Sequence, residues 1–191
     1  MRNGFIGTVL IVLMMNAVSP AYSEERPTNV ISTGLVDLFA AFDGWYSIVE
    51  YERSIDEQNA VVLGAFRANN NGLRKDDGSR LSIRMDGVES GFRRFTSGPG
   101  AWRFYYGAGL NISGLKAEKT SAGGAESSGS AICYEPKAEI GGAFRKKTGF
   151  AFTFGMEIGY LISDLKLDGQ PVPGGGNSAV GRPFMNIGWG W

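Results

Sequence analysis

The segment from Phe150 to Ser163 alternates between large apolar side chains and small or polar ones. Every second residue from Phe150 to Ile162 is large and apolar, while the residues between them are mostly small or polar. Successive side chains of a β-strand point to opposite faces of a sheet, so this period of two predicts a strand. Soluble strands are usually about 5–6 residues long. The segment is longer and satisfies the about 9–11 residues that a tilted strand needs to cross a bilayer.

Seven further segments have strand character. We therefore predict one all-β domain, an eight-stranded antiparallel up-and-down transmembrane β-barrel, with strands at Asn29–Leu38, Trp45–Ser54, Ala60–Ala68, Leu81–Phe95, Trp102–Ser113, Ala131–Phe144, Phe150–Ser163 and Ala179–Trp191. Two positions interrupt the pattern. In the fourth strand the apolar residues change parity after Met85, which predicts a β-bulge at Gly87. In the sixth strand Pro136 removes a ladder donor and predicts a bulge or the loop-side end of the strand.

The connections between these strands alternate in length after the first turn. Short turns are expected at Asp56–Asn59, Thr96–Ala101 and Arg145–Gly149, and long polar loops at Asn69–Ser79, Lys116–Ser130 and Asp164–Ser178. Outer-membrane barrels have short periplasmic turns and longer extracellular loops. This regularity places the three long loops at the cell surface.

The N-terminal region has the features of a secretory signal. Arg2 is followed by an apolar stretch from Phe5 to Met15 and by the small-x-small triplet that ends at Ser23. This pattern predicts a signal peptide at residues 1–23 and a mature barrel domain at residues 24–191. No later apolar run could form a membrane helix, so membrane insertion would require a β-barrel. The single Cys133 cannot form an internal disulfide and is interpreted as a packing residue.

The face opposite the apolar set carries both signs of charge. An eight-stranded barrel has an interior just wide enough for side chains. Charges withdrawn from water there must be paired. We predict a lumen network of Glu50, Glu52, Arg67, Glu89, Arg93, Arg103, Glu135, Lys137, Glu139, Glu157 and Arg182. The network could be a narrow ion path or gate, but a structural plug is favoured over both, and a wide pore is not expected.

Residue chemistry gives no support for an enzyme. The chain has no histidine, so the histidine-dependent arrangements of barrel hydrolases cannot be built. Glutamate pairs could act as acids and bases, but paired lumen carboxylates are the favoured interpretation. There is no metal-ligand spacing, and the Gly174–Gly176 run lacks the lysine and helix of a phosphate loop. We expect no catalytic residues, no cofactor and no metal. The zero formal net charge gives no reason to expect nucleic acid as a partner.

The last strand carries a resemblance to a known class. It ends in NIGWGW, with Ile187, Trp189 and Trp191 at alternate positions and an aromatic residue at the end. This pattern resembles the C-terminal assembly signal of small bacterial outer-membrane barrels of the OmpA/OmpX-like class, although their last residue is usually Phe. The segments SIVEYERSI and SGFRRF also resemble the DUF3575-type barrels. Trp45, Trp102, Tyr160, Trp189 and Trp191 would then form interfacial girdles.

The resemblance implies a location and partners. It implies a monomer in the outer membrane of a Gram-negative cell, in contact with membrane lipid and lipopolysaccharide and inserted by the barrel-assembly machinery. A structural or surface-interaction role would follow, with a surface ligand bound through the long loops. One alternative stays open, because alternation is symmetric under inversion. A soluble periplasmic or secreted lipocalin-like barrel would turn the apolar set inward to bind a small apolar ligand.

Overall fold

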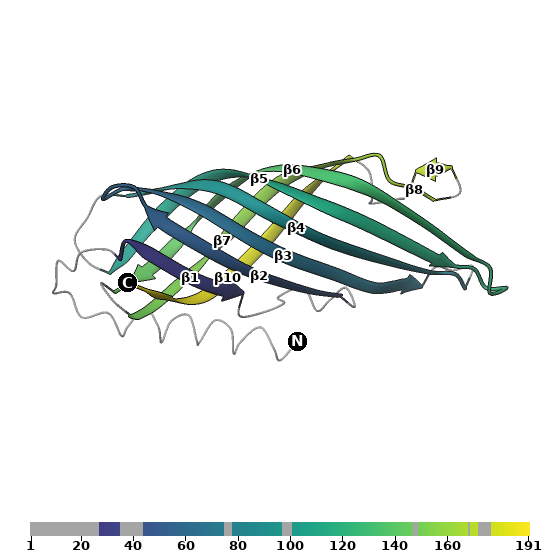
Figure 1. Cartoon of the computed structure of the whole chain (residues 1–191), viewed down its shortest axis with the longest axis horizontal. Coiled ribbons are helices and arrows are strands. Elements are labelled where there is room, and N and C mark those ends of the chain that lie inside the picture. Colours follow the sequence, from purple (N-terminus) through teal and green to yellow (C-terminus); the bar gives the residue numbers. More distant parts are fainter. Residues whose placement is uncertain are drawn as a thin grey trace, which may run out of the picture.

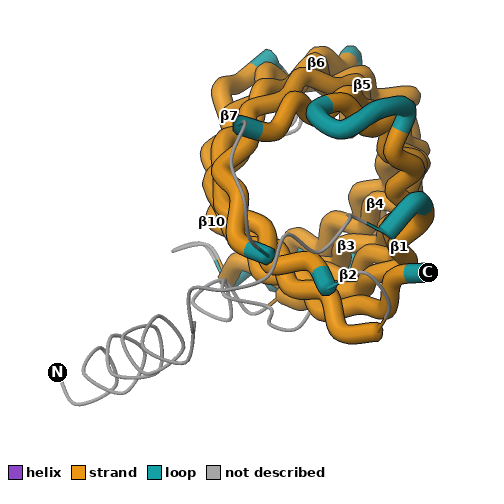
Figure 2. The backbone as a smooth tube through the Cα atoms, turned by 90° about the vertical axis from the view of Figure 1, so that its left-hand side faces the viewer, coloured by secondary structure: helices purple, strands orange, loops and turns teal. Residues whose placement is uncertain are grey.

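Eight antiparallel strands close into one barrel in the computed structural model, which describes residues 27–34, 44–74, 78–96, 101–146, 149–167, 169–171 and 177–191. The wall strands are β1 (Asn29–Gly34), β2 (Gly44–Ser54), β3 (Asn59–Arg74), β4 (Arg80–Phe95), β5 (Trp102–Thr120), β6 (Glu126–Arg145), β7 (Gly149–Ser163) and β10 (Ser178–Gly190). The short strands β8 (Lys166–Leu167) and β9 (Gln170–Pro171) form a separate hairpin. Figures 1 and 2 show the inclined strands and the closed ring. The eight-stranded antiparallel barrel is therefore confirmed.

Neighbouring strands in the chain are neighbours in the wall, and β1 closes the ring against β10. In that closing pair Val30 lies opposite Gly190 and Gly34 lies opposite Asn186. The backbone N–H and C=O groups of Asn29 and Trp191 exchange hydrogen bonds of 3.0 Å. Closure pairs strand edges that would otherwise be open. The signal peptide predicted at residues 1–23 and the part of the first strand predicted at residues 35–38 lie outside the described residues.

Large apolar side chains point outward from all eight wall strands. Phe104 is 70% exposed, Ile158 66% and Ile140 65%. We call this surface the outer belt: Ile31, Val49, Val61, Leu63, Val88, Phe92, Phe104, Tyr106, Leu110, Ile112, Ile132, Tyr134, Ile140, Phe150, Met156, Ile158, Tyr160, Ile162, Trp189 and Trp191. The charged and small residues between them face the lumen. The orientation that alternation alone left open is thus charged-in and apolar-out through the belt.

Glycines make room in the lumen for long side chains from neighbouring strands. Gly107 of β5 lies opposite Glu139 of β6, and a Cβ at Gly107 would come within 2.8 Å of the Glu139 Oε1 atom. A Cβ at Gly159 would come within 2.3 Å of the Glu135 Oε1 atom. The alternation of small and charged residues on the inner face therefore lets the charged side chains cross the lumen.

Three strands, β3, β5 and β6, extend several residues further toward the loop end than the sequence predicts. Residues 69–74 belong to β3, residues 116–120 to β5 and residues 126–130 to β6, so the expected long loops at 69–79 and 116–130 are wrong. Strand β3 ends at Arg74 and β4 begins at Arg80, while β5 ends at Thr120 and β6 begins at Glu126. Figure 1 shows the ends of these strands reaching beyond the rest of the barrel on the right-hand side. The prediction assigns these polar residues to loops. Outward positions on a strand above the belt can be equally polar because they face water.

The bulge predicted at Gly87 is wrong. Strands β4 and β5 pair without a register shift from Arg80 opposite Thr120 to Phe95 opposite Tyr105. The irregularity between β3 and β4 lies instead between Asn70 and Leu73. What changes near Gly87 is the chemistry of the two faces: above it the inward residues are apolar and the outward residues are polar.

Pro136 is neither a bulge nor the end of its strand, so both alternatives predicted for it are wrong. Strand β6 continues beyond it to Glu126. On the β7 side Tyr134 pairs with Ile162 and Lys137 with Gly159 in one unshifted register. Pro136 occupies an exposed, outward position, and the ladder is interrupted only locally.

The loop end of the barrel has an apolar interior. Its buried cluster, which we call the loop-end core, consists of Leu81, Leu115, Ala117, Cys133, Leu161, Leu165 and Leu167. Leu165 and Leu167 come from the β7–β10 connection and fill this interior from the loop side. Cys133 is 1% exposed, in agreement with a packing role. Within the described ranges, no helix is both long and apolar enough to cross a membrane.

Candidate functional site

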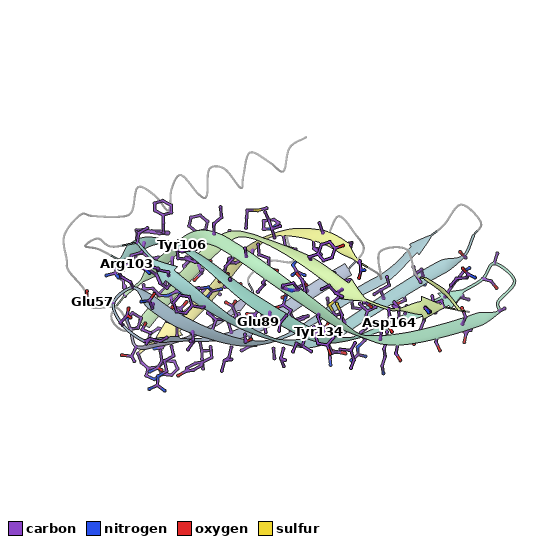
Figure 3. The ribbon with its side chains drawn as sticks, turned by 90° about the horizontal axis from the view of Figure 1, so that it is seen from above. Glu57, Glu89, Arg103, Tyr106, Tyr134 and Asp164 are labelled. Atoms are coloured by element: carbon purple, nitrogen blue, oxygen red, sulfur yellow. The ribbon has the colours of Figure 1, made fainter. Side chains whose placement is uncertain are left out.

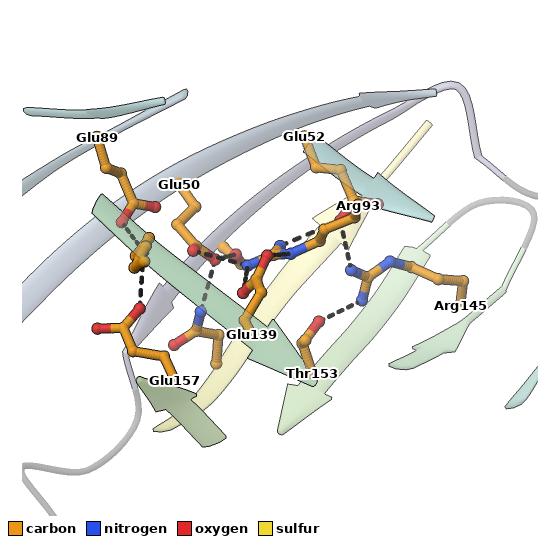
Figure 4. A network of polar contacts seen from close by, with 11 residues as sticks. Glu50, Glu52, Glu89, Arg93, Glu139, Arg145, Thr153 and Glu157 are labelled. Carbon is orange, nitrogen blue, oxygen red and sulfur yellow. Dashed lines mark hydrogen bonds and ion pairs between the residues drawn. The ribbon is translucent and has the colours of Figure 1, made fainter. Parts of the chain in front are cut away.

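Arg93 of β4 is the centre of a buried ion-pair network in the lumen (Figure 4). Its Nε donates to Glu139 Oε1 at 2.8 Å, and its Nη atoms donate to Glu50 at 3.1 Å and Glu52 at 3.2 Å. The guanidinium also lies 5.2 Å from the centre of the Tyr105 ring. Arg93 is 2% exposed. A planar guanidinium with several donors can bind three carboxylates at once, here two from β2 and one from β6.

Arg145 extends the network toward the turn end. Its Nη2 donates to Glu52 Oε2 at 3.1 Å, and its Nη1 donates to Thr153 Oγ1 at 2.7 Å and to the Phe152 carbonyl at 3.2 Å. Sequence reasoning placed Arg145 in a turn and missed this role. The signal was available, because Arg145 has the same parity as Glu139 and is the last residue of β6.

A second group of contacts lies around Lys137 and Arg182. Lys137 Nζ donates to Glu89 and to Glu157, both at 2.7 Å. Arg182 of β10 donates to Glu157 at 2.6 Å and forms a short ion pair with Glu135. These contacts join strands that are adjacent or two apart in the ring, so they fix the lumen side chains and also connect neighbouring parts of the wall.

Hydrogen bonds from neutral side chains connect β1 and β10 to the network. Asn186 of β10 donates its amide to Glu50 at 2.6 Å, and Ser32 of β1 donates its hydroxyl to the same carboxylate at 3.4 Å. Neither residue was named from the sequence. The predicted lumen network contains only charged residues, and these two inward-facing side chains are neutral.

The structure brings together most of the lumen residues named from the sequence, namely Glu50, Glu52, Glu89, Arg93, Glu135, Lys137, Glu139, Glu157 and Arg182. The prediction for Arg67 is wrong, because its exposed side chain faces outward and pairs with Asp86. Arg103 lies at the turn end and donates to the Glu57 carbonyl at 2.7 Å, so its assignment to the network is also wrong (Figure 3).

Carboxylates outnumber cations in this network. Six glutamates face four cations, Arg93, Lys137, Arg145 and Arg182. Glu89 Oε1 and both amide atoms of Asn111 are buried without a protein partner. Removing one member of a buried pair costs about 3–5 kcal/mol, because the other charge remains without compensation. The network therefore constrains which lumen residues can change singly.

Apolar groups adjoin the charges toward both ends. The loop-end core lies above them. At the turn end Ala60, Phe95, Tyr105 and Ala143 form a second cluster, with Phe184 packed against it. A continuous wide water path would have to pass charged side chains locked to one another and two groups of close-packed apolar residues. Among the described residues, charged and apolar side chains thus lie in the interior at the level of the network and toward both of its ends.

The residues of the C-terminal strand lie at the seam of the barrel. Ile187 is paired with Thr33 of β1 and Phe152 of β7, and Trp189 is paired with Ile31 and Phe150. Trp189 and Trp191 are exposed on the outer belt. The side chain of Trp45 lies outside the described residues, whereas Trp102 packs at 5.2 Å from the Phe144 ring.

Comparison with protein-family models finds no match, and comparison with curated proteins finds none either. Across the described ranges, no group of three or more His, Cys, Asp or Glu side chains is placed to hold a metal ion.

Proposed function

We propose that this protein is an integral outer-membrane β-barrel with a filled lumen and a structural or surface-interaction role. The observation that carries the proposal is the outer belt, which includes large exposed apolar side chains from all eight wall strands. The largest apolar patch of a typical soluble monomer is about 300–600 Å². Lipid around the barrel would remove the belt from water and satisfy it in every direction.

The change of chemistry along the strands supports the same proposal. On β5 the outward residues are apolar from Phe104 to Ile112 and then polar at Lys116 and Glu118. The inward residues change in the opposite sense, from Asn111 and Ser113 to Leu115. A boundary between lipid and water accounts for both changes, since the barrel needs an apolar outside in lipid and an apolar core where its outside is wet.

A lipocalin-like carrier receives less support. Such a barrel holds its apolar ligand in an apolar interior, whereas the middle of this lumen contains the ion-pair network. Of the two apolar clusters that the structure describes in the interior, the loop-end core is packed with Leu165 and Leu167 of the chain itself, and the turn-end cluster is filled by Phe95 and Tyr105. Alternation in the sequence is compatible with either set of residues facing inward. In the folded chain the charged set faces the lumen.

Fractionation of cells that make the full-length chain tests the proposal. We expect the protein in the outer membrane, with an unboiled sample that resists detergent and moves differently on a gel after heating. Purified chain should also refold into phosphocholine vesicles and become protected from protease. A protein that stays in the periplasmic fraction, shows no heat-dependent shift and does not enter vesicles would overturn the proposal and revive the carrier hypothesis.

A further inference from the structure

We propose that Arg67, Arg84 and Lys116 form a site on the outer wall for the phosphate of a glycolipid in the outer leaflet, of the lipopolysaccharide type. Arg67 is on β3, Arg84 on β4 and Lys116 on β5, and all three are exposed. This inference rests on the proposed function, because it requires a barrel that is surrounded by lipid. It names one lipid class as a specific partner of one face.

The strand register brings these cations together. Arg84 lies directly opposite Lys116, and Arg67 lies directly opposite Asp86 of β4. Residues directly opposite on antiparallel strands have Cβ atoms about 4.5–5.5 Å apart. The two arginine side chains are each 51% exposed. The site is therefore a small cluster on one face of three adjacent strands.

The cluster lies directly above the outer belt. Ala65 on β3, Val88 on β4 and Ile112 on β5 are outward positions that lie two residues closer to the turn end than Arg67 and Asp86, and four residues closer than Arg84 and Lys116. A step of two residues along a strand is roughly 6.6 Å. In the proposed membrane this is the depth at which acyl chains end and headgroup phosphates begin.

The charges of the cluster are not balanced by the protein. In the two outward rows that contain the cluster, three cations face one carboxylate, Asp86. Asp86 accepts a hydrogen bond from Arg84 Nε at 2.8 Å and forms an ion pair with Arg67 Nε. It holds the two guanidiniums side by side and leaves the cluster positive. The next outward acid, Glu118, is opposite Ser82 in the row above.

Like charges directly opposite each other destabilise a sheet pair. The placement of Arg84 against Lys116 is thus unfavourable in the protein alone and becomes favourable when an anion binds between them. Guanidinium groups bind phosphate through paired N–H donors, and lysine adds a point charge. A phosphorylated lipid at the same depth has the required charge and is present at high local concentration.

The exposed cations at the turn end provide a contrast. Arg53 lies opposite Asn29 and Val61, and Arg94 lies opposite Asn59 and Tyr106. Neither has a cation as a cross-strand neighbour. Neither can bind one phosphate together with a second cation, and they serve as matched controls because they are outward residues of the same barrel.

The test uses the full mature chain folded in phosphocholine micelles, with bisphosphorylated lipid A as the probe and retained lipid counted by native mass spectrometry. Each cation near an anionic lipid surface contributes about 1 kcal/mol, which is roughly a five-fold change in affinity. We expect the triple variant Arg67→Gln, Arg84→Gln and Lys116→Gln to lose affinity on the order of 100-fold by the same estimate. The control pair Arg53→Gln and Arg94→Gln should bind like wild type.

Two further probes identify the source of the phosphate. Dephosphorylated lipid A should bind the wild type as weakly as the triple variant binds the intact lipid, and millimolar inorganic phosphate should not compete. Competition by inorganic phosphate, or equal retention by wild type and triple variant, would overturn the inference.

Should the triple variant misfold, Lys116→Gln alone must still lower the affinity for lipid A roughly five-fold. The heat-dependent gel shift is measured on each sample: failure of wild type to fold in micelles counts against the proposed function, whereas unchanged retention by folded protein counts only against the site.

Discussion

Replacing Ile140 by arginine distinguishes a barrel surrounded by lipid from one surrounded by water. Ile140 is 65% exposed on the outer face of β6, between Tyr106 of β5 and Met156 of β7. Full burial of such a side chain contributes about 1.5–3 kcal/mol, so the buried third accounts for about 0.5–1 kcal/mol. In water the substitution should therefore lower the free energy of unfolding by about 1 kcal/mol at most.

In a bilayer the same substitution has a larger cost. An arginine on the lipid face near the midplane destabilises a barrel by about 2–4 kcal/mol, which is roughly a 30- to 900-fold change in the folding equilibrium. The assay is urea unfolding and refolding in phosphocholine vesicles, followed by tryptophan fluorescence in both directions. Ser128→Arg is the matched control, because Ser128 is an exposed residue of the same strand beyond the outer belt. It should change stability by less than about 0.5 kcal/mol.

The refuting result is clear in this design. If the free energies of unfolding of Ile140→Arg and Ser128→Arg in vesicles both lie within about 1 kcal/mol of the wild-type value, lipid does not surround the belt. The control also guards against a general effect of added positive charge, since both variants carry the same new side chain on the same strand.

Three other predictions concern the lumen and one turn. Arg93→Met should cost about 3–5 kcal/mol in vesicle unfolding, because three buried carboxylates lose their shared partner, whereas Arg103→Met at the turn end should cost less than about 0.5 kcal/mol; equal costs would contradict the network. Gly159→Val should cost about 1–3 kcal/mol, because its new carbons meet a carboxylate of β6, and an unchanged unfolding midpoint would show that the lumen has spare room. Hydrogen bonds, first from the Asn59 side chain, hold the pKa of the Asp56 carboxyl below its ordinary 3.8, so their contribution to stability is present above pH 3.8 and is lost as pH falls through the lower folded-state pKa. An NMR titration of Asp56 with a midpoint at or above 3.8 would contradict this.

The strands were predictable because alternation within the outer belt is strong. The whole of β7 was assigned to the correct faces, since Phe150 to Ile162 contrast clearly with the residues between them. The inward glutamates followed from the same parity. Their specific partners did not, because strand tilt and register decide that Arg93 meets Glu50 and Glu52 across the lumen.

The errors at Gly87, at Arg67 and in the long loops share one physical source, which is that the prediction treats the parity of a position and its environment as one variable. At Gly87 the apolar residues change parity, and this was explained by a change of face, whereas the environment of both faces changes and the strand continues. Arg67 and the residues near Lys116 were misplaced for the same reason. A sequence shows which positions are polar, but it does not show at what height along a strand the chemistry of the inward and outward faces changes.

The polar extensions of β3, β5 and β6 also have a consequence for how the barrel would insert into the proposed membrane. In the proposed membrane, the β5–β6 tip would have to carry Lys116, Glu118 and Glu126 from one side of the bilayer to the other during insertion. Each charged side chain in hydrocarbon costs up to about 2–4 kcal/mol, so the crossing is a kinetic barrier in both directions. Once the tip has emerged, the same barrier slows its retraction through the bilayer. The lifetime of the inserted state would then be set by the rate of retraction and not by the depth of its free-energy minimum.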